Sequence, residues 1–175
     1  MIEENVQDAK TTPKNAWLVG SDGAWAGFPG ADWQCLGPPY LPEDLYRTRD
    51  GLLVATGHGL WFVDADGRWV QRHDEVLTEL LSVVTDARDE PVVAGSYGVS
   101  LPRRDEAGHY RWHSTTDARV PDERYTNVVR LLSDTRWLAG TEAGLLQTDD
   151  AGANWDRTAL WGSPVRCLER VDNQW

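Results

Sequence analysis

The sequence predicts an all-β fold made of repeated four-stranded antiparallel sheets. A short apolar run followed by small residues and a glycine occurs four times, with copies that end at Gly23, Gly59, Gly98 and Gly144. A separate series of tryptophans advances in step with it, at Trp33, Trp69, Trp112 and Trp155. Both series repeat about every 40 residues, the period of a propeller blade, and helical periodicity is nearly absent. The predicted architecture is therefore a β-propeller with about four blades' worth of strands.

The strands within each repeat follow from short β-branched or aromatic runs that are bounded by Gly, Asp and Pro. In the best-defined unit we expect strands at 127–133, 136–141, 144–148 and 154–158. Residues 1–14 are expected to form an N-terminal tail and residues 15–175 the propeller. Its units are predicted at approximately 15–37, 43–73, 78–116 and 125–160, followed by a closing strand at 163–175. The segment 74–84 is the nearest approach to a helical pattern.

The expected strands leave the first blade incomplete. Residues 16–36 supply three strands, each of the next three units supplies four, and residues 163–173 supply a lone innermost strand. The two chain ends can thus share one blade, which would remove exposed strand edges. A closed four-bladed monomer, two copies that exchange C-terminal strands, and part of a larger propeller all fit this pattern. Because 173–175 (Asn-Gln-Trp) echoes 15–17 (Asn-Ala-Trp), the sequence favours a first blade completed by a partner chain or by further blades.

The turn between the last two strands of the fourth unit holds the most specific motif. Residues 148–155, Thr-Asp-Asp-Ala-Gly-Ala-Asn-Trp, fit the pattern Ser/Thr-x-Asp-x-Gly-x-x-Trp, and decayed copies lie at 29–33, 64–69 and 105–112. A carboxylate can lock such a turn through backbone N–H groups, a glycine can take positive φ, and a tryptophan can pack the turn onto the blade. The residues expected in these structural roles are Thr148, Asp150, Gly152 and Trp155.

This motif resembles the Asp-box (BNR-type) repeat of sialidase, sortilin and photosystem II assembly-factor propellers. The run 128–145 is also similar to the repeat of two-component-regulator propellers. The resemblance covers residues 15–175 at the level of architecture and implies a β-propeller. It does not transfer a function, because one fold hosts many activities.

The predicted innermost strands carry the candidate ligand-binding residues. Aligning their apolar runs makes four positions equivalent, namely Arg47, Ser82, Arg130 and Arg166. Three guanidiniums from different blades could converge on one carboxylate or phosphate, because the planar fork binds such anions in bidentate fashion. The set resembles in kind the arginine clusters of sialidases and of the photosystem assembly factor. The competing interpretation is that each arginine pairs with an acidic residue of a neighbouring blade.

These features favour a non-catalytic binding or assembly module that recognises a protein segment or small anionic ligand at the channel face. The alternative is a sialidase-like or other glycoside-processing enzyme, with Tyr46, Tyr125 and Glu123 as the nearest candidates for its chemistry. A further alternative is a structural half of a larger propeller. No catalytic motif is present, so activity stays an open question. The expected partner is another protein, or a second copy, that completes the ring.

Charge and cysteine content limit the remaining function classes. The chain has 28 acidic and 17 basic residues, a formal net charge of −11 that disfavours nucleic acid as a partner. No apolar run approaches the ~18 residues of a membrane span, so no membrane partner is expected. Cys35 and Cys167 lack metal or redox spacing, and His109 and His113 lack a third ligand, so we expect no metal and no cofactor. The N-terminus lacks a signal-peptide pattern, which predicts a cytoplasmic location, or a secreted or periplasmic one if a leader has been removed.

Overall fold

The computed structural model describes residues 17–20, 23–36, 41–74 and 77–170, and it confirms the all-β prediction. Within these residues the strands form four antiparallel sheets, which we number in chain order. A single short helix, α1 (Pro121–Arg124), occurs in the described ranges, and the sequence analysis did not anticipate it. The expected tail at 1–14 and the echo at 173–175 lie outside the described residues.

Each sheet is a meander in which every strand pairs with the next one along the chain. The first sheet contains β1 (Trp17–Gly20), β2 (Ala24–Gly27) and β3 (Gln34–Cys35). The second contains β4 (Pro42–Arg47), β5 (Gly51–Thr56), β6 (Gly59–Asp64) and β7 (Trp69–Gln71). The third contains β8 (Leu80–Thr85), β9 (Pro91–Gly95), β10 (Gly98–Arg104) and β11 (Tyr110–Ser114). The fourth contains β12 (Thr126–Leu131), β13 (Trp137–Thr141), β14 (Gly144–Thr148) and β15 (Asp156–Trp161).

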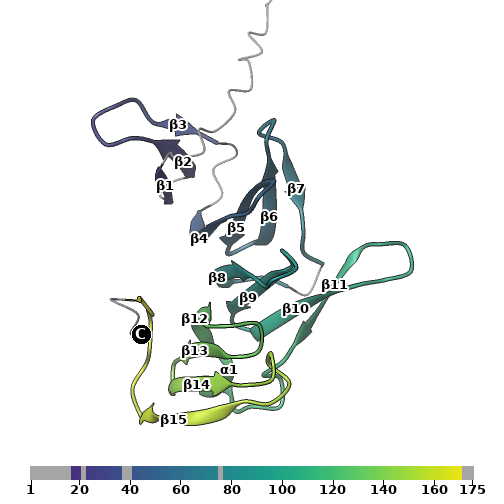
Figure 1. Cartoon of the computed structure of the whole chain (residues 1–175), viewed down its shortest axis with the longest axis vertical. Helices are drawn as coiled ribbons and strands as arrows, with labels where there is room; N and C mark the ends of the chain where they lie inside the picture. Colours follow the sequence, from purple (N-terminus) through teal and green to yellow (C-terminus); the bar gives the residue numbers. More distant parts are fainter. Residues whose placement is uncertain (1–16, 21–22, 37–40, 75–76, 171–175) are drawn as a thin grey trace, which may run out of the picture.

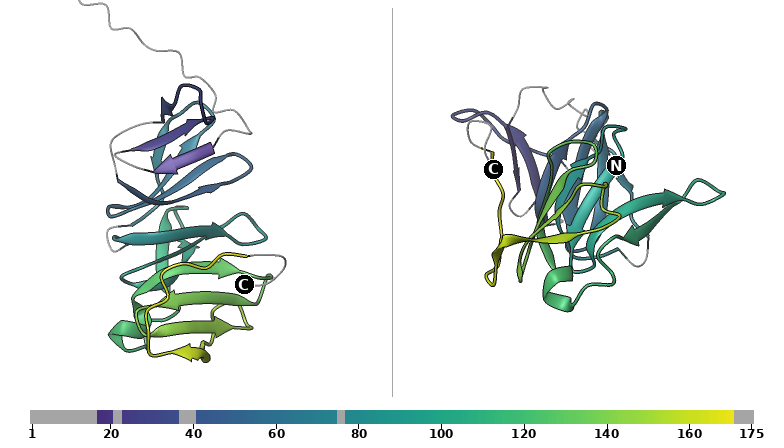
Figure 2. Two further views of the ribbon diagram at one scale, coloured as in Figure 1. Left: turned by 90° about the vertical axis from the view of Figure 1, so that its left-hand side faces the viewer. Right: turned by 60° about the horizontal axis from the view of Figure 1, so that its bottom comes forward.

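The four sheets are arranged as an open fan (Figure 1). The first strands of the second, third and fourth sheets, β4, β8 and β12, lie side by side at its centre, and we call them the inner strands. The later strands of each sheet extend outward from them. The side view in Figure 2 shows the same succession of sheets, stacked one after another. No closed ring is formed by the described residues, because the side of the fan opposite the second and third sheets carries no sheet.

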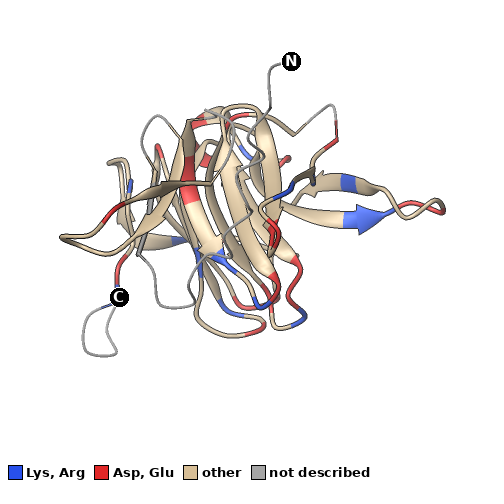
Figure 3. Cartoon of the chain, turned by 90° about the horizontal axis from the view of Figure 1, so that it is seen from above, with Lys and Arg blue, Asp and Glu red and all other residues tan. Residues whose placement is uncertain are grey.

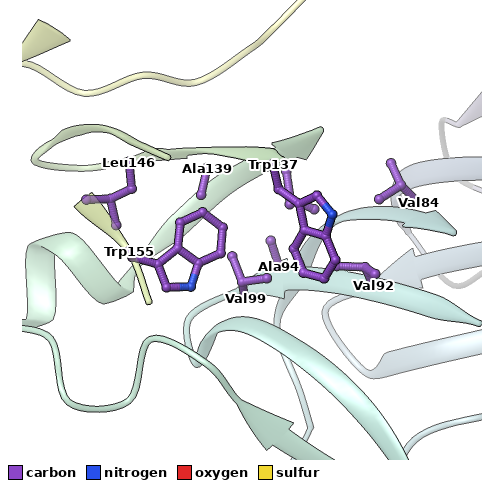
Figure 4. Packing of buried hydrophobic residues seen from close by; sticks show 9 residues of the cluster. Val84, Val92, Ala94, Val99, Trp137, Ala139, Leu146 and Trp155 are labelled. Atoms are coloured by element: carbon purple, nitrogen blue, oxygen red, sulfur yellow. The ribbon is translucent and has the colours of Figure 1, made fainter. Parts of the chain in front are cut away.

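Apolar side chains fill the spaces between successive sheets. One buried cluster joins the third and fourth sheets and includes Val99, Trp137 and Trp155, whose packing is shown in Figure 4. A second cluster, around Leu60 and Leu80, joins the second and third sheets. Burying these side chains is the main force that holds neighbouring sheets together, because each sheet alone would expose an apolar face.

A tight turn between β9 and β10 packs closely against the chain that follows β11 of the same sheet. Gly98 has a φ of 83°, and a Cβ at this position would lie 1.8 Å from Thr116 Oγ1. The Thr116 hydroxyl accepts the backbone N–H of Val99 at 3.2 Å. Only glycine fits both the positive φ and this close approach.

The C-terminal segment differs from the prediction of a closing strand. Residues 163–170 carry no strand, and they do not pair with β1 to complete the first sheet. Instead, the Val165 N–H donates to Thr141 O at 2.9 Å, and Val165 O accepts from Asn127 Nδ2 at 3.3 Å. The segment therefore runs along the fourth sheet on the open side of the fan (Figure 1). A strand ladder needs a second backbone at hydrogen-bonding distance, and no described strand lies beyond this segment.

The segment 74–84, the nearest approach to a helical pattern, forms no helix in its described residues, 74 and 77–84. Its second half enters β8, and Asp74 Oδ1 accepts the Leu77 N–H at 3.1 Å where the chain approaches that strand. Apolar residues on both faces of β8 are buried between two sheets, and this favours a strand here over a helix.

Candidate functional site

The inner strands share one irregularity, a bulge at the same place in each. Pairing with the following strand skips one residue on each inner strand, at Glu43, Leu81 and Asn127. Because the bulge recurs, residues of the three sheets can be matched through their cross-strand partners. The matched sets are Asp44 with Ser82 and Val128, Tyr46 with Val84 and Arg130, and Arg47 with Thr85 and Leu131.

This register contradicts the predicted equivalence of Arg47, Ser82 and Arg130. Arg47 lies one register position beyond the place of Arg130, and Ser82 lies two positions before it. Successive side chains of a strand point to opposite faces, so Arg47 and Arg130 do not share a face of their sheets. The sequence alignment matched apolar runs, and these runs do not begin at the same register position in the three inner strands.

A chain of hydrogen bonds links the inner strands of three sheets. Asp44 Oδ2 on β4 accepts the Ser82 hydroxyl at 3.1 Å and the Val83 N–H at 3.0 Å, both on β8. Ser82 Oγ in turn accepts the Val129 N–H at 3.3 Å and an N–H of Arg130 Nη1 at 3.4 Å, both on β12. Asp44 on β4 and Ser82 on β8 thus each accept hydrogen bonds from the inner strand of the next sheet. Asp44 could not be found from the sequence, because its equivalence to Ser82 shows only in the cross-strand register.

The three candidate arginines have different surroundings. Arg130 is half-buried, donates from Nη1 to Val129 O at 2.9 Å, and has no carboxylate partner among the described residues. Arg47 is exposed and forms no hydrogen bond or ion pair with the described part of the chain. Arg166 lies 3.3 Å from Glu142 Oε2, the acidic pairing that the competing interpretation expects. The structure therefore brings Ser82 and Arg130 together and places Arg166 with an acid.

The turn at 148–155 forms a closely bonded loop. Thr148 Oγ1 donates to Asp150 Oδ1 at 2.7 Å and accepts the Gly152 N–H at 3.1 Å. Asp150 also accepts the backbone and side-chain N–H groups of Asn154, each at 2.8 Å. The hydrogen bond from the Asn154 side chain, followed by that from Thr148, lowers the pKa of Asp150 to about 2. Gly152 has a φ of 86°, and Trp155 is buried in the cluster between the third and fourth sheets.

Two of the decayed copies keep an acidic lock, at a different position from Asp150. Asp64 Oδ1 accepts the N–H groups of residues 66 and 68, and Asp105 Oδ1 accepts those of residues 107 and 109. In the complete copy the Thr148 hydroxyl accepts the N–H groups two and four residues later. The acid in the decayed copies therefore takes the place of Thr148, which sequence spacing alone did not distinguish.

Three of the four repeated tryptophans bridge neighbouring sheets, whereas Trp33 is exposed. The indole N–H of Trp69 donates to Leu36 O at 2.8 Å, and that of Trp112 donates to Arg72 O at 3.0 Å. The indole N–H of Trp155 donates to Thr115 Oγ1 at 3.1 Å. Each of these bonds begins on the fourth strand of one sheet, or on the turn that leads into that strand. It ends on the residues that directly follow the last strand of the preceding sheet. These contacts give this series an architectural role.

The residues considered for glycoside chemistry are engaged in packing and ion pairing. Glu123, on α1, is only 3% exposed and forms ion pairs with Arg119 and Arg157. Burial alone would raise the pKa of Glu123, but hydrogen bonds and charge from both arginines outweigh it and hold the pKa below its ordinary value. Tyr46 packs against the two clusters on either side of the third sheet, and Tyr125 is partly exposed.

Neither a cluster of metal ligands nor a membrane-spanning helix occurs in the described ranges. These residues contain no group of three or more His, Cys, Asp or Glu that could hold a metal ion. His109 Nδ1 lies 3.5 Å from Asp105 Oδ2, and Cys35 and Cys167 are exposed. None of the described helical structure has the length and apolarity needed to cross a membrane.

Comparison with known proteins identifies the fold. No family model and no curated protein matches the chain. The extracellular domain of BT4673 from B. thetaiotaomicron has a TM-score of 0.62 at 12% identity, covering 86% of this chain and 23% of that chain. An ancestral GH74 enzyme has a TM-score of 0.62 at 16% identity, covering 88% of this chain and 23% of that chain. YCF48 bound to a D1 peptide has a TM-score of 0.56 at 14% identity, covering 82% of this chain and 50% of that chain.

The chain therefore matches 23 to 50% of the length of these structures. At such low identity the likeness concerns the arrangement of strands and not the chemistry of a site. All three are β-propeller proteins, and their agreement with the fan of four meander sheets shows that this chain has a β-propeller fold.

Proposed function

We propose that the chain is a non-catalytic β-propeller module of the Asp-box type that binds a protein segment or a small anionic ligand at its inner strands. The observation that carries the proposal is the lack of an acidic partner for Arg130 and Arg47 within the described residues, although acidic residues outnumber basic ones by 28 to 17. Guanidiniums that are not neutralised internally are suited to bind a carboxylate or phosphate.

Two further observations support binding over glycoside processing. Glu123 is held by two arginines, so it is poorly placed to act as the partner of a tyrosine nucleophile. YCF48, a propeller of similar arrangement, is described in complex with a peptide, which supports a protein segment as the class of ligand. The Asp-box assignment is supported by the bonded turn around Asp150 and the buried Trp155.

The test uses a hexaglutamate peptide as the probe for an acidic protein segment, titrated by isothermal calorimetry. A variant that combines Arg47→Met, Arg130→Met and Arg166→Met should bind the peptide at least tenfold more weakly, because it removes three potential charge-assisted contacts. Arg68→Met is the single-site control, since Arg68 is exposed on the β6–β7 turn. Unchanged affinity in the triple variant, with the fold intact by circular dichroism, would contradict the proposal.

We also propose that a protein partner or a second copy supplies further blades on the open side of the fan. The support is the place of residues 163–170, which extend along the fourth sheet where the innermost strand of another blade would begin. Exposed sheet edges recruit further strands, so this side is suited to pairing. Light scattering should give a mass above 19.6 kDa if the chain completes itself with a second copy. A mass of one chain at every concentration would contradict the second-copy version.

A further inference from the structure

A cleft between the second and third sheets lies away from the inner strands and gathers basic side chains. It has a volume of about 450 Å³, and its walls are the segment after β7 and the hairpin β10–β11. Its lining includes Arg72, Arg104, Arg111 and Asp74. The hairpin projects from the body, with basic residues on both of its strands (Figure 3). In a chain with a net charge of −11, this concentration of positive charge is a local exception.

Arg72 is fixed in the cleft by its backbone and by aromatic rings. Its N–H donates to Leu60 O at 2.9 Å, and its carbonyl accepts the Trp112 indole N–H at 3.0 Å. Its guanidinium carbon lies 5.0 Å from the ring centroid of Phe62 and 5.4 Å from that of Tyr110. Stacking on ring faces holds a guanidinium in place while its N–H groups stay available in the ring plane.

The same tyrosine orders a second arginine. The guanidinium carbon of Arg104 lies 4.3 Å from the Tyr110 centroid, and Arg104 Nη2 donates to the Tyr110 hydroxyl at 2.8 Å. Arg104 has one distant acidic neighbour, Glu90, at 3.8 Å. Tyr110 in turn stacks on Trp112 with 6.0 Å between ring centroids. The two arginines are therefore positioned before any ligand arrives, which reduces the entropy lost on binding.

The acids around the cleft are already engaged by the backbone. Asp74 accepts the N–H groups of Leu77 and Trp112, one on each carboxylate oxygen. Asp105 locks its own turn through Oδ1, and its Oδ2 lies 3.4 Å from Arg111 Nε. Arg72 has no acidic partner within the described residues. A carboxylate engaged by backbone donors neutralises a neighbouring cation less fully, so the cleft keeps positive charge.

From this arrangement we infer that the cleft is a second binding site, for the carboxylate or phosphate group of a small ligand. Arg72 supplies a planar pair of donors, and Arg104 and Arg111 supply further positive charge. The ring of Tyr110 gives the site an apolar wall beside the oxyanion. The site is separate from the inner strands and does not depend on the function proposed for them.

The test titrates the whole chain separately with inorganic phosphate and with citrate, by calorimetry at low salt. Arg72→Met keeps an apolar side chain between the sheets and removes the guanidinium, so affinity for the bound anion should fall about tenfold or more. Arg68→Met removes one positive charge from the neighbouring turn outside the cleft, so it should bind nearly as the original chain does. Rising sodium chloride should weaken binding, because both partners are charged.

The two titrations identify which oxyanion the cleft prefers. Arg111→Met gives a second test that does not disturb the stacked rings, since its side chain is 63% exposed and, among the described residues, its ion pair is with Asp105. It should weaken binding about threefold or more. Failure of both anions to bind, or equal losses in Arg72→Met and Arg68→Met, would overturn the inference. Loss of phosphate and citrate binding in the inner-strand triple variant, with Arg72→Met unaffected, would assign the anion site to the inner strands instead.

Discussion

Replacing Glu123 by glutamine tests whether the carboxylate on α1 is a structural or a reactive group. Its side chain is 4% exposed and is paired with Arg119, whose side chain is 26% exposed, and with Arg157, whose side chain is 57% exposed. Breaking a fully buried ion pair by removing one partner costs about 3–5 kcal/mol. Because water screens the charge of Arg157, we expect the substitution to lower the free energy of unfolding by about 2–3 kcal/mol.

The loss should depend on pH in a definite direction. The two arginines hold the pKa of Glu123 below its ordinary value despite its burial, so the folded protein protonates this group less readily than the unfolded chain does. The stability that the charge contributes is therefore complete above the unfolded pKa and is lost as the pH falls through the folded pKa. The difference between the original chain and Glu123→Gln should shrink on acidification.

Urea unfolding followed by circular dichroism measures the loss, and thermal melting should show a shift of about 4–10 °C for a domain of this size. The control is Glu106→Gln, since Glu106 is exposed near the tip of the β10–β11 hairpin and should change stability by less than about 0.5 kcal/mol. A Glu123→Gln protein as stable as the original at neutral pH would refute the structural reading of this carboxylate. A stability difference that stayed constant into acid would refute the assigned origin of the lowered pKa.

Two more predictions concern side chains that join neighbouring sheets, and a third concerns the bonded turn at 148–155. Trp155→Ala should destabilise the fold by about 3–5 kcal/mol, and Trp155→Phe by less, in denaturant titrations, because the ring fills the cluster between the third and fourth sheets. Asp44→Ala should lower the free energy of unfolding by about 1–3 kcal/mol, since it leaves backbone and hydroxyl donors of β8 without their acceptor. Glu43→Ala, at the exposed neighbouring residue, should lower it much less in the same assay. Carboxyl ¹³C NMR should give Asp150 a pKa of about 2, and the pKa should be higher in Asn154→Ala. The stability that the Asp150 charge contributes is therefore present at neutral pH and is lost as the pH falls from the ordinary Asp range toward 2. An unshifted pKa of Asp150 would contradict the bonding seen in the turn.

Much of the architecture is readable in the sequence because it is local. The β13–β14 hairpin was placed to within a residue, since a turn of small residues and a glycine fixes where each strand ends. The turn at 148–155 is local in the same sense, because Thr148, Asp150 and Gly152 bond to one another within a few residues. The tryptophan series was readable from its spacing alone.

The candidate site depends on relations that no local pattern contains. The register of the inner strands places Arg47 one position beyond Arg130, and it makes Asp44 the counterpart of Ser82. The basic cleft likewise requires that a segment after one sheet and a hairpin of the next be brought together. Both the register and the cleft depend on which strands and segments lie side by side in the folded chain.

By itself, then, the sequence determined the strand type, the period of the repeat and the bonded turns, because these follow from residue spacing and short-range hydrogen bonds. The tertiary structure alone decided the register between inner strands, the partners of each arginine and the course of residues 163–170. A one-residue shift in a strand reverses the direction of every side chain after it. Asp44, for example, accepts the hydroxyl of Ser82 from the neighbouring sheet, 38 residues further along the chain.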